Sequence, residues 1–391
     1  MGLEEEGKEV YKEALEVVRK VSESLGSGEL VPISRAHISG VSYVNIGDAG
    51  LEFIRDLAER GGRFRVATTL NPVAVDLEKW KEMDVPEEIV SKQKEIVELL
   101  VKMGAKPTLT CTPYLIDPPK RGEQVAWGES NAVLYANSVL GARTNREGGP
   151  LTILEAICGK APYLGLRIDE GRKPTVEVYF EKEVWKAVEN RKIPYSALGY
   201  SLGLAVGRGV PLLMETRLPF KHIKNFLAAV GASSSIGLVL IRGLSPEVKE
   251  SNFYREKVEK ISLSLTEVED SIEKFRKKAE KADAVFLGCP HLSPSELREI
   301  FYFLEKKGWT PRKKVILSTS RWALNQVGGK ICREKMDKVI ILSDTCIVVS
   351  PIEYMNVKHV VTDSAKAAYY LSNKGLDVTL LPRKTILGDI I

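Results

Sequence analysis

ADAVFLGCPHLSPSELREIFYFLEKKGWTPRKKVILS, residues 282–318, decides the fold of this chain through its order of apolar and amphipathic stretches. An apolar run over 284–288 has the length of a buried strand, and Ser293-Pro294 then begins an amphipathic stretch of helical length. A second apolar run follows at 314–318. Because strands joined through a helix pair in parallel, this stretch predicts one β-α-β unit.

The same alternation continues to the end of the chain. Before it, Thr266 and Glu269 have the spacing of a capping box that opens a helix over 267–282. The later pattern predicts a mainly parallel sheet covered by helices, with helices over 321–327 and 364–375 and strands over 338–343, 357–362 and 378–382. Ligands bind beyond the carboxyl ends of such strands, where the sequence places Cys289, Ser318, Ser320, Asp344 and Cys346.

Helix and strand patterns also occur earlier in the chain. A helix is predicted over 86–104, and a strand over 106–110 leads into Cys111. Glycines at a spacing of four indicate a close helix crossing in the core, and these are Gly199, Gly203 and Gly207.

The length of the chain indicates several folding units. A chain of 391 residues with 44% hydrophobic content buries more core than one small domain holds. We therefore predict an α/β fold with mainly parallel sheets flanked by helices, in two or more packed subdomains. The expected boundaries are an N-terminal region 1–120, a central region 121–260 and a C-terminal subdomain 261–391.

Charge and hydropathy exclude several classes of protein. The 57 basic and 52 acidic residues are interspersed, so the formal charge of +5 forms no basic tract and nucleic-acid binding is not indicated. No apolar stretch reaches the roughly 20 residues that cross a bilayer. The N-terminus is acidic and amphipathic, unlike a signal peptide, and we expect a cytoplasmic protein.

Three of the five cysteines lie just past strand-like runs: Cys111, Cys289 and Cys346. Three thiolates at one sheet edge can hold a 4Fe-4S cluster and leave its fourth iron open as a Lewis acid. Such an iron is labile to oxygen, so isolation as a 3Fe-4S cluster is expected. Zinc is the rival metal, although close C-x-x-C pairs are absent. A third alternative makes Cys289 a nucleophile with His291 as its base.

The two other cysteines are not assigned to the metal. Cys158 follows a helical pattern and precedes Gly159, as a core residue at a helix end would. Cys332 lies in a charged stretch and fits either surface or core.

Residues 129–150, ESNAVLYANSVLGARTNREGGP, form a dense polar motif that is a candidate substrate site. Arginine forks match carboxylate and phosphate oxygens, so two arginines are predicted as anion clamps, with surface salt bridges as the alternative. The asparagines either hydrogen-bond substrate or cluster, or shape turns. A glutamate either assists proton transfer or pairs with an arginine. The residues concerned are Asn131, Asn137, Arg143, Thr144, Asn145, Arg146 and Glu147.

Four motifs together with 129–150 resemble the aconitase X family, a divergent branch of the aconitase superfamily, over nearly the whole chain. They are PISRAHISG at 32–40, TCTPYL at 110–115, GCPHLS at 288–293 and SDTC at 343–346. The resemblance implies an aconitase-like fold, hydro-lyase activity, and cluster ligation by Cys111, Cys289 and Cys346. Members act on (R)-5-phosphomevalonate, giving trans-anhydromevalonate 5-phosphate in isoprenoid synthesis, or on cis-3-hydroxy-L-proline.

The resemblance also implies a partner and further site residues. In the archaeal type, a small swivelling-domain subunit is a separate polypeptide and is expected to carry the serine base. Scarce glutamine with abundant lysine and glutamate favours this thermophile-like type, with a phosphorylated hydroxy acid as substrate. His37 and Ser39 match the family's N-terminal site loop, with His37 as a candidate acid.

Ser364 and Lys366, at the start of the last helix, would surround a phosphate. Helix capping by Asp363 or Ser364 is the simpler explanation. Two other functions stay open from the sequence: dehydration of hydroxyproline or a similar hydroxy acid, and a non-catalytic scaffold stabilised by a metal.

Overall fold

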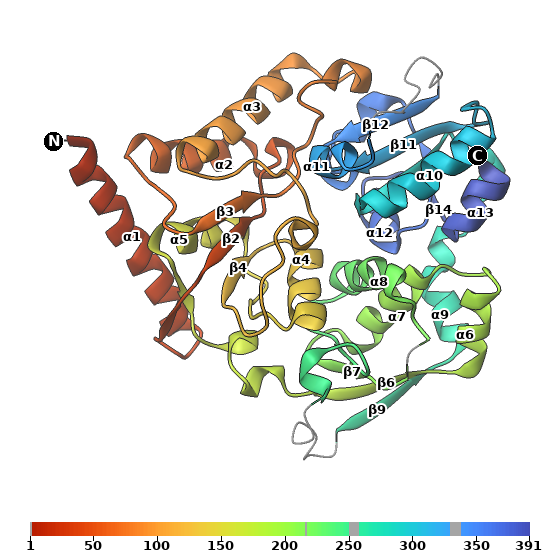
Figure 1. The fold of residues 1–391 in the computed structure, drawn as a ribbon, viewed down its shortest axis with the longest axis horizontal. Coiled ribbons are helices and arrows are strands. Elements are labelled where there is room, and N and C mark those ends of the chain that lie inside the picture. The colour runs from red at the N-terminus through yellow and green to blue at the C-terminus, as the bar shows by residue number, and fades with distance from the viewer. Residues whose placement is uncertain (1, 216, 250–257, 329–337) are drawn as a thin grey trace.

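The computed structural model describes residues 2–215, 217–249, 258–328 and 338–391, which form three α/β regions packed side by side (Figure 1). Three parallel sheets, one in each region, have helices on their faces, and a short antiparallel pair joins β1 (Leu30–Pro32) to β5 (Lys160–Pro162). The predicted α/β fold with parallel sheets flanked by helices is confirmed. No helix in the described part of the chain is long and apolar enough to cross a membrane.

The first region contains a three-stranded parallel sheet with the order β3 (Ala67–Leu70), β2 (Arg35–Ile38) and β4 (Val125–Trp127). Its helices are α1 (Gly2–Ser24), α2 (Tyr43–Glu59), α3 (Glu87–Lys102) and α5 (Gly149–Cys158). Helix α3 confirms the helix predicted over 86–104. It packs against α2, and α1 packs against α5, which buries one apolar core.

The strand predicted over 106–110 does not form, and this expectation was wrong. The segment runs beside β3 but pairs with it through an isolated bridge from Lys106 to Thr69, and the Thr108 hydroxyl and the Thr110 N–H both donate to the Leu70 carbonyl. Pro107 has no N–H to donate to a ladder, and Leu109 has a φ of 42°. Cys111 is therefore delivered by an irregular segment that β3 anchors.

The second region contains the parallel sheet β8 (Leu240–Ile241), β7 (Pro211–Leu213), β6 (Val176–Phe180) and β9 (Glu259–Leu263), in that order. Its helices are α6 (Lys182–Glu189), α7 (Tyr195–Val206), α8 (Phe220–Ser233) and α9 (Leu265–Ile272). Helix α4 (Ser130–Tyr135), which continues into a π-helical turn at Ala136–Leu140, packs against α8.

Helices α7 and α8 cross closely, as the glycine spacing predicted. A Cβ atom on Gly199 would lie 2.1 Å from the Phe226 carbonyl oxygen, and one on Gly203 would lie 2.0 Å from the Ser233 hydroxyl. Hydrogen atoms in place of side chains allow this approach. The prediction of a core helix crossing is confirmed for Gly199 and Gly203. Gly207 takes no part in the crossing, because it caps the end of α7 with a φ of 69° and a Cβ atom there would meet nothing within 4 Å.

The start of α9 differs from the prediction. The capping box is formed by Ser264 and Glu267, and the helix ends at Ile272. Ser264 has an extended backbone and accepts a hydrogen bond from Glu267 N–H, so Thr266 lies inside the first turn. The expected box of Thr266 and Glu269 is therefore wrong by two residues.

The third region contains a five-stranded parallel sheet with the order β12 (Val339–Ser343), β11 (Lys314–Thr319), β10 (Ala284–Leu292), β13 (His359–Thr362) and β14 (Asp377–Leu380). Helices α10 (Pro294–Lys306), α11 (Arg321–Asn325), α12 (Ala365–Asn373) and α13 (Arg383–Thr385) accompany it. Every residue of β10 is buried, as expected for the central strand of a parallel sheet. The strand order reverses between β10 and β13, which is where such sheets bind ligands.

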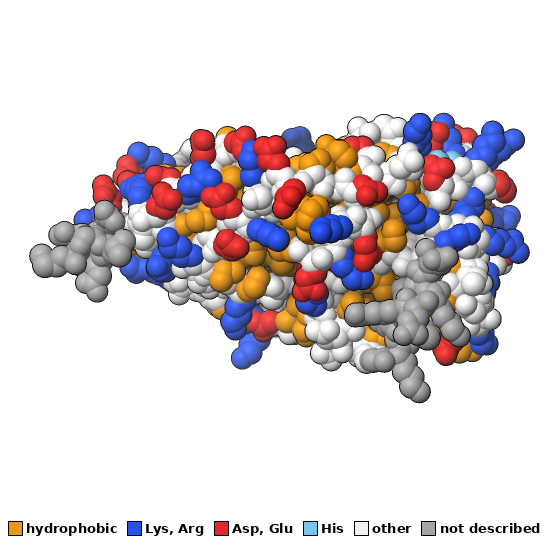
Figure 2. Space-filling view, turned by 90° about the horizontal axis from the view of Figure 1, so that it is seen from above, with side chains coloured by type: hydrophobic (Ala, Val, Ile, Leu, Met, Phe, Trp, Pro, Cys, Tyr) orange, Lys and Arg blue, Asp and Glu red, His pale blue; other side chains and the backbone are white. Residues whose placement is uncertain are grey.

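On the face shown in Figure 2, basic and acidic side chains are interspersed, with apolar side chains between them. This mixed-sign surface agrees with the interspersed charges of the sequence.

Candidate active site

The structure brings the three predicted cysteines together at the carboxyl edge of the third sheet. Cys289 lies in the second half of β10, and Cys346 follows β12. Cys111 precedes the short 3-10 helix at Pro113–Leu115. Cys111 and Cys289 are 6% and 5% exposed. The sulfurs are near enough to interact electrostatically, since a charge on Cys346 raises the pKa of both other thiols. Cys111 and Cys346, 235 positions apart in the chain, are thus brought near each other.

Hydrogen-bond donors lie near each of the three sulfur atoms. The backbone N–H of His291 donates to Cys111 Sγ over 3.3 Å. The nearby Ser364 hydroxyl lowers the pKa of Cys289, and the N–H groups of Val348 and Val349 lower that of Cys346, against the larger effect of burial. Donors of this kind stabilise thiolates that ligate iron–sulfur clusters.

His291 connects the three cysteine-bearing segments. Its Nε2–H donates to the Thr345 carbonyl over 2.9 Å, and its Nδ1 lies 3.3 Å from the Thr110 hydroxyl. Burial lowers the pKa of His291 to about 4, so the ring is neutral at pH 7. The ring bonds residues next to Cys346 and Cys111, which favours a positioning role over that of a base for Cys289.

Burial keeps the three cysteines protonated when no cation is present. It raises the pKa of Cys289 to about 12, although Lys366 opposes this shift. The pKa values of Cys111 and Cys346 are raised for the same reason. A metal bound here must therefore displace thiol protons, which makes metal uptake dependent on pH.

A buried ion pair between Glu129 and Lys366 lies beside the cysteines. Burial alone would raise the pKa of Glu129, but Lys366 lowers it to about 2. Burial alone would lower the pKa of Lys366, but Glu129 and Cys289 raise it. Glu129 also caps α4 by accepting from Asn131 N–H over 3.2 Å. Both charges therefore persist at neutral pH.

His37 is joined to this ion pair through Asn71. The His37 Nε2–H donates to Asn71 Oδ1 over 3.3 Å, and Asn71 Nδ2 donates to Glu129 over 3.2 Å. Thr69 lies 2.8 Å from the other ring nitrogen. Burial lowers the pKa of His37 to about 4, so the ring is neutral at pH 7.

Ser39, Asn131 and Ser364 also lie around the cysteines or the ion pair. Ser39 packs against Gly128, where a Cβ atom would be 2.3 Å from its hydroxyl oxygen. Asn131 donates from Nδ2 to the Cys111 carbonyl over 2.9 Å, so it holds the cysteine-bearing segment. Ser364 caps α12 by accepting from Ala367 N–H over 3.1 Å. The capping alternative for Ser364 is confirmed, and its phosphate role stays a prediction.

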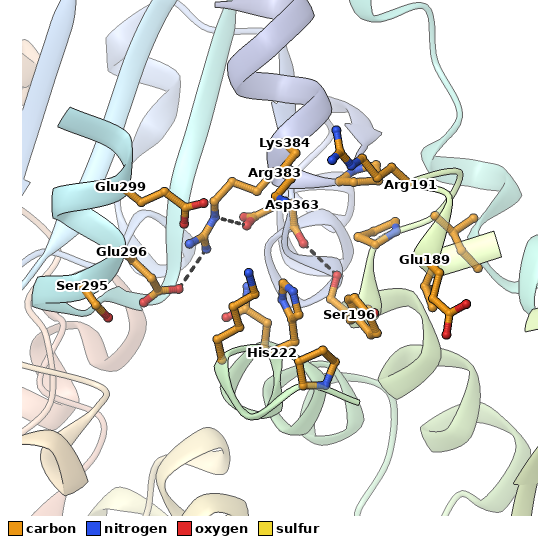
Figure 3. A pocket seen from close by; sticks show the side chains of 18 residues that line it. Glu189, Arg191, Ser196, His222, Ser295, Glu296, Glu299, Asp363, Arg383 and Lys384 are labelled. Carbon is orange, nitrogen blue, oxygen red and sulfur yellow. Dashed lines mark hydrogen bonds and ion pairs between the residues drawn. The ribbon is translucent and has the colours of Figure 1, made fainter. Parts of the chain in front are cut away.

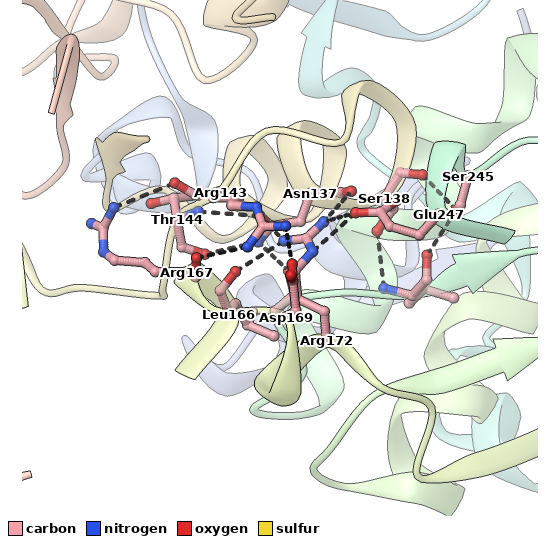
Figure 4. A network of polar contacts seen from close by, with 12 residues as sticks. Asn137, Ser138, Arg143, Thr144, Leu166, Arg167, Asp169, Arg172, Ser245 and Glu247 are labelled. Atoms are coloured by element: carbon pink, nitrogen blue, oxygen red, sulfur yellow. Dashed lines mark hydrogen bonds and ion pairs between the residues drawn. The ribbon is translucent and has the colours of Figure 1, made fainter. Parts of the chain in front are cut away.

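Most of the remaining motif residues belong to a second polar network (Figure 4). Arg143 pairs with Asp169 and donates to the Arg167 carbonyl. Asn137 Oδ1 accepts from Thr144 N–H and from Arg172. Asn145 donates from Nδ2 to the Leu164 carbonyl and accepts from Leu166 N–H. These contacts fix the loops that follow α4, and substrate binding by Asn137, Arg143, Thr144 and Asn145 stays a prediction.

Glu147 and Arg146 make different structural contacts. Glu147 is 7% exposed and forms a two-oxygen ion pair with Arg167, with both distances 3.0 Å. Arg146 donates to the carbonyls of Ser234 and Gly231 at the end of α8. Pairing with arginine was the alternative for Glu147, and its role in proton transfer stays a prediction, as does the anion clamp at Arg146.

The buried carboxyl group of Glu155, on α5, predicts how the stability of the folded chain depends on pH. It is fully buried, both its oxygens lack hydrogen-bond partners in the described structure, and burial followed by the Glu147 charge raises its pKa well above 4.5. Native Glu155 is therefore protonated where the unfolded chain is ionised, so stability falls as pH rises above about 4.5. Glu155→Gln should increase the free energy of unfolding by on the order of 1 kcal/mol at pH 8 and less at pH 4.

Urea unfolding at both pH values measures this effect, with the exposed Glu98→Gln as control. Equal stability changes at pH 4 and pH 8 would contradict the assignment.

Among the described residues, no three His, Cys, Asp or Glu side chains are grouped to hold one metal ion. Ligation of an iron–sulfur cluster by the three cysteines stays a prediction. In a cubane cluster each thiolate binds a different iron, so the sulfurs need to face one another without converging on one point. Cys158 is 4% exposed, and its Sγ lies 3.3 Å from the Lys160 carbonyl at the end of α5, which confirms it as a core residue. Cys332 lies outside the described residues.

Fold and site together define a three-region α/β protein with a thiol-lined site at the edge of a parallel sheet. Sequence models of the aconitase X first, second and third domains match residues 1–170, 174–273 and 282–389. The chain belongs to the aconitase X family.

The chain is 38% identical over 388 residues to the phosphomevalonate dehydratase large subunit of Methanocaldococcus jannaschii, covering 98% of this chain and 94% of that one. It is 40% identical to the protein of the same name from Methanothermobacter thermautotrophicus over 94% of this chain and 92% of the relative. The crystal structure of Thermococcus kodakaraensis aconitase X in its holo-form superposes with a TM-score of 0.88 at 35% identity, covering 98% and 96% of the two chains.

Sequence reasoning missed Asn71, Glu129 and the connecting role of His291. Glu129 stands first in the motif at 129–150, directly before the helix it caps, and that position was the available signal. Asn71 follows β3 and was visible only as a polar strand end. Their partners lie 58 to 237 positions away, beyond the reach of any local pattern.

Proposed function

We propose that this chain is the large subunit of a hydro-lyase that dehydrates (R)-5-phosphomevalonate to trans-anhydromevalonate 5-phosphate. The observation that carries the proposal is the match over 98% of the chain to a phosphomevalonate dehydratase large subunit. The relative named cis-3-hydroxy-L-proline dehydratase, from Pseudomonas aeruginosa, is 33% identical, and this chain spans 63% of its length. The greater identity and the matching length favour the phosphorylated substrate.

The cysteine site supplies the chemistry in this proposal. A 4Fe-4S cluster held by Cys111, Cys289 and Cys346 would supply an open iron as a Lewis acid toward the departing hydroxide. Lys366 places a buried ammonium beside the cysteines, where it attracts the anionic substrate. Glu129 stays ionised because its pKa is about 2, so it orients Lys366 and does not donate a proton.

His37 orients Asn71 and, through it, Glu129. An acid role for His37 stays a prediction, and its neutral ring weighs against it. The base that removes the proton is expected from a small subunit, which the name of the relatives' chain implies. In this proposal the large chain alone has no turnover.

Activity of the reconstituted protein tests the function. We expect the chain, co-expressed without oxygen with a candidate small subunit, to dehydrate phosphomevalonate at least about 100-fold faster than either chain alone, because general base catalysis contributes about this much. Product formation is measured by mass spectrometry, with cis-3-hydroxy-L-proline as the competing substrate. Turnover of hydroxyproline without turnover of phosphomevalonate would show that the chain belongs to a cis-3-hydroxy-L-proline dehydratase instead. Full activity of the large chain alone would contradict the partner.

A further inference from the structure

A cavity of about 400 Å³ lies between the second and third regions (Figure 3). It is lined by the starts of α7, α8 and α10 and by the segments that follow β13 and β14. The three cysteines are not among its lining residues. Asp363 lines it, and the next residue, Ser364, lies near enough to Cys289 to lower the pKa of its thiol, so the cavity and the cysteine site are neighbours.

The cavity occupies a position where parallel sheets bind ligands. Glu296 follows β10, Asp363 follows β13, and Arg383 follows β14, so three carboxyl strand ends meet there. The strand order reverses between β10 and β13. Crevices outside the carboxyl ends at such a reversal are the usual ligand sites of open α/β sheets. Cys346 follows β12, on one side of β10 in the sheet. The cavity lies at the ends of β13 and β14, on the other side of β10.

Two buried acceptors in the cavity wall lack partners in the described structure. Asp363 is 5% exposed, and its Oδ2 accepts from Arg383 while its Oδ1 has no partner. Asn225 is 8% exposed, and its Oδ1 has no partner. A buried acceptor without a donor costs about 1–3 kcal/mol. Because both residues line the cavity, a ligand that carries O–H or N–H groups would supply the missing donors.

The mouth of the cavity is positively charged. Arg191, Lys221 and Lys384 are exposed there. Burial, and then the charges of Lys221 and Arg383, lower the pKa of His222 to about 4. This field favours an anion at the mouth.

The acidic side chains of the lining are mostly compensated. Glu296 pairs with Lys224 and Arg383, and Glu189 lies 3.5 Å from Arg217. Glu299 is half-buried in the wall on α10 and faces the cavity as a further acidic group. The charges of the exposed Arg191, Lys221 and Lys384 are therefore less compensated than those of the acidic side chains, and the cavity favours an anionic ligand.

We propose that this cavity is a second ligand site, which binds a small hydroxylated organic anion separately from the cysteine site. Hydroxyl groups donate to Asp363 and Asn225, and the phosphate or carboxylate lies against Lys221, Lys384 and Arg191. The volume suits a ligand of this size. The proposal concerns binding alone and holds whichever reaction the cysteine site performs.

Isothermal titration of the full chain with glycerol 3-phosphate and with glycerate tests the site, and the two compounds separate a phosphate from a carboxylate. At least one should bind with a Kd of about 1 mM or tighter, and more tightly than inorganic phosphate or glycerol. Lys221→Glu combined with Lys384→Glu should weaken binding about tenfold or more. The exposed pair Lys94→Glu and Lys102→Glu on α3 is the matched control.

A second variant separates binding from folding. Asn225→Leu removes an unpartnered acceptor, so it should leave the melting temperature unchanged or higher and still weaken binding about tenfold. Cys346→Ala should leave binding intact if the two sites are separate. Failure of both compounds to bind, or equal binding to the wild type and the Lys221/Lys384 variant, would overturn the proposal. Loss of binding in Cys346→Ala would assign the ligand to the cysteine site.

Discussion

Cys289→Ala is expected to abolish dehydration and to remove visible absorbance near ~400 nm from protein purified without oxygen. Cys289 lies in β10 near enough to Cys346 for the two thiols to interact electrostatically, so in the proposed site its loss removes one of three cluster ligands. A metal Lewis acid contributes several kcal/mol to the transition state, so activity should fall by more than about a thousandfold. Absorbance, iron content and turnover are measured on the same anaerobic sample.

Cys158→Ala is the matched control for this experiment. It also removes a buried cysteine, but one that lies at the end of α5 and contacts the Glu155 and Lys160 carbonyls. Its chromophore and turnover should stay at wild-type levels. A chromophore that survives Cys289→Ala, or disappears equally in both variants, would refute the ligand assignment.

Lys366→Met is expected to lower the free energy of unfolding by about 3–5 kcal/mol, because it leaves the Glu129 carboxylate buried without its counter-charge. The two side chains are 10% and 15% exposed. Glu129→Gln together with Lys366→Met should recover part of this loss, since no buried charge then remains. Denaturant unfolding measures all three variants, and Lys94→Met on the exposed face of α3 should change stability by less than about 0.5 kcal/mol.

The same pair predicts a pH dependence. The pKa of Glu129 is lowered to about 2 from 4.5, so its stabilising effect is fully present above pH 4.5. It is lost as the pH falls from about 4.5 toward 2, where the native carboxylate takes up a proton. The difference in stability between wild type and the double variant should shrink over this range. A stability difference that stays constant from pH 4.5 to pH 2 would show that the Glu129–Lys366 ion pair does not cause the pH dependence.

Local patterns in the sequence correctly indicated the third region. The strands β10 to β14 and the start of α10 at Ser293-Pro294 follow from apolar runs and helix-start residues that act over a few positions. These patterns gave wrong predictions at two places where a single residue sets the local backbone conformation. Pro107 interrupts the strand expected before Cys111. Ser264, two residues before Thr266, is the residue that caps α9. Within the site, Cys289 lies in β10 and Cys346 follows β12 of the same sheet, as strand-end placement predicted, whereas Cys111 reaches them from an irregular segment beside β3.

The sequence by itself determined that this chain is an α/β protein of the aconitase X type and that Cys111, Cys289 and Cys346 are the candidate ligands. Only the tertiary structure decided what surrounds them: the Glu129–Lys366 pair, the His37–Asn71 contact and the ring of His291 between two threonines. It also placed Arg143 and Glu147 in a separate network. The physical reason is that periodicity and capping arise from neighbouring residues, whereas buried charges and hydrogen bonds find partners across distant segments that only packing brings together.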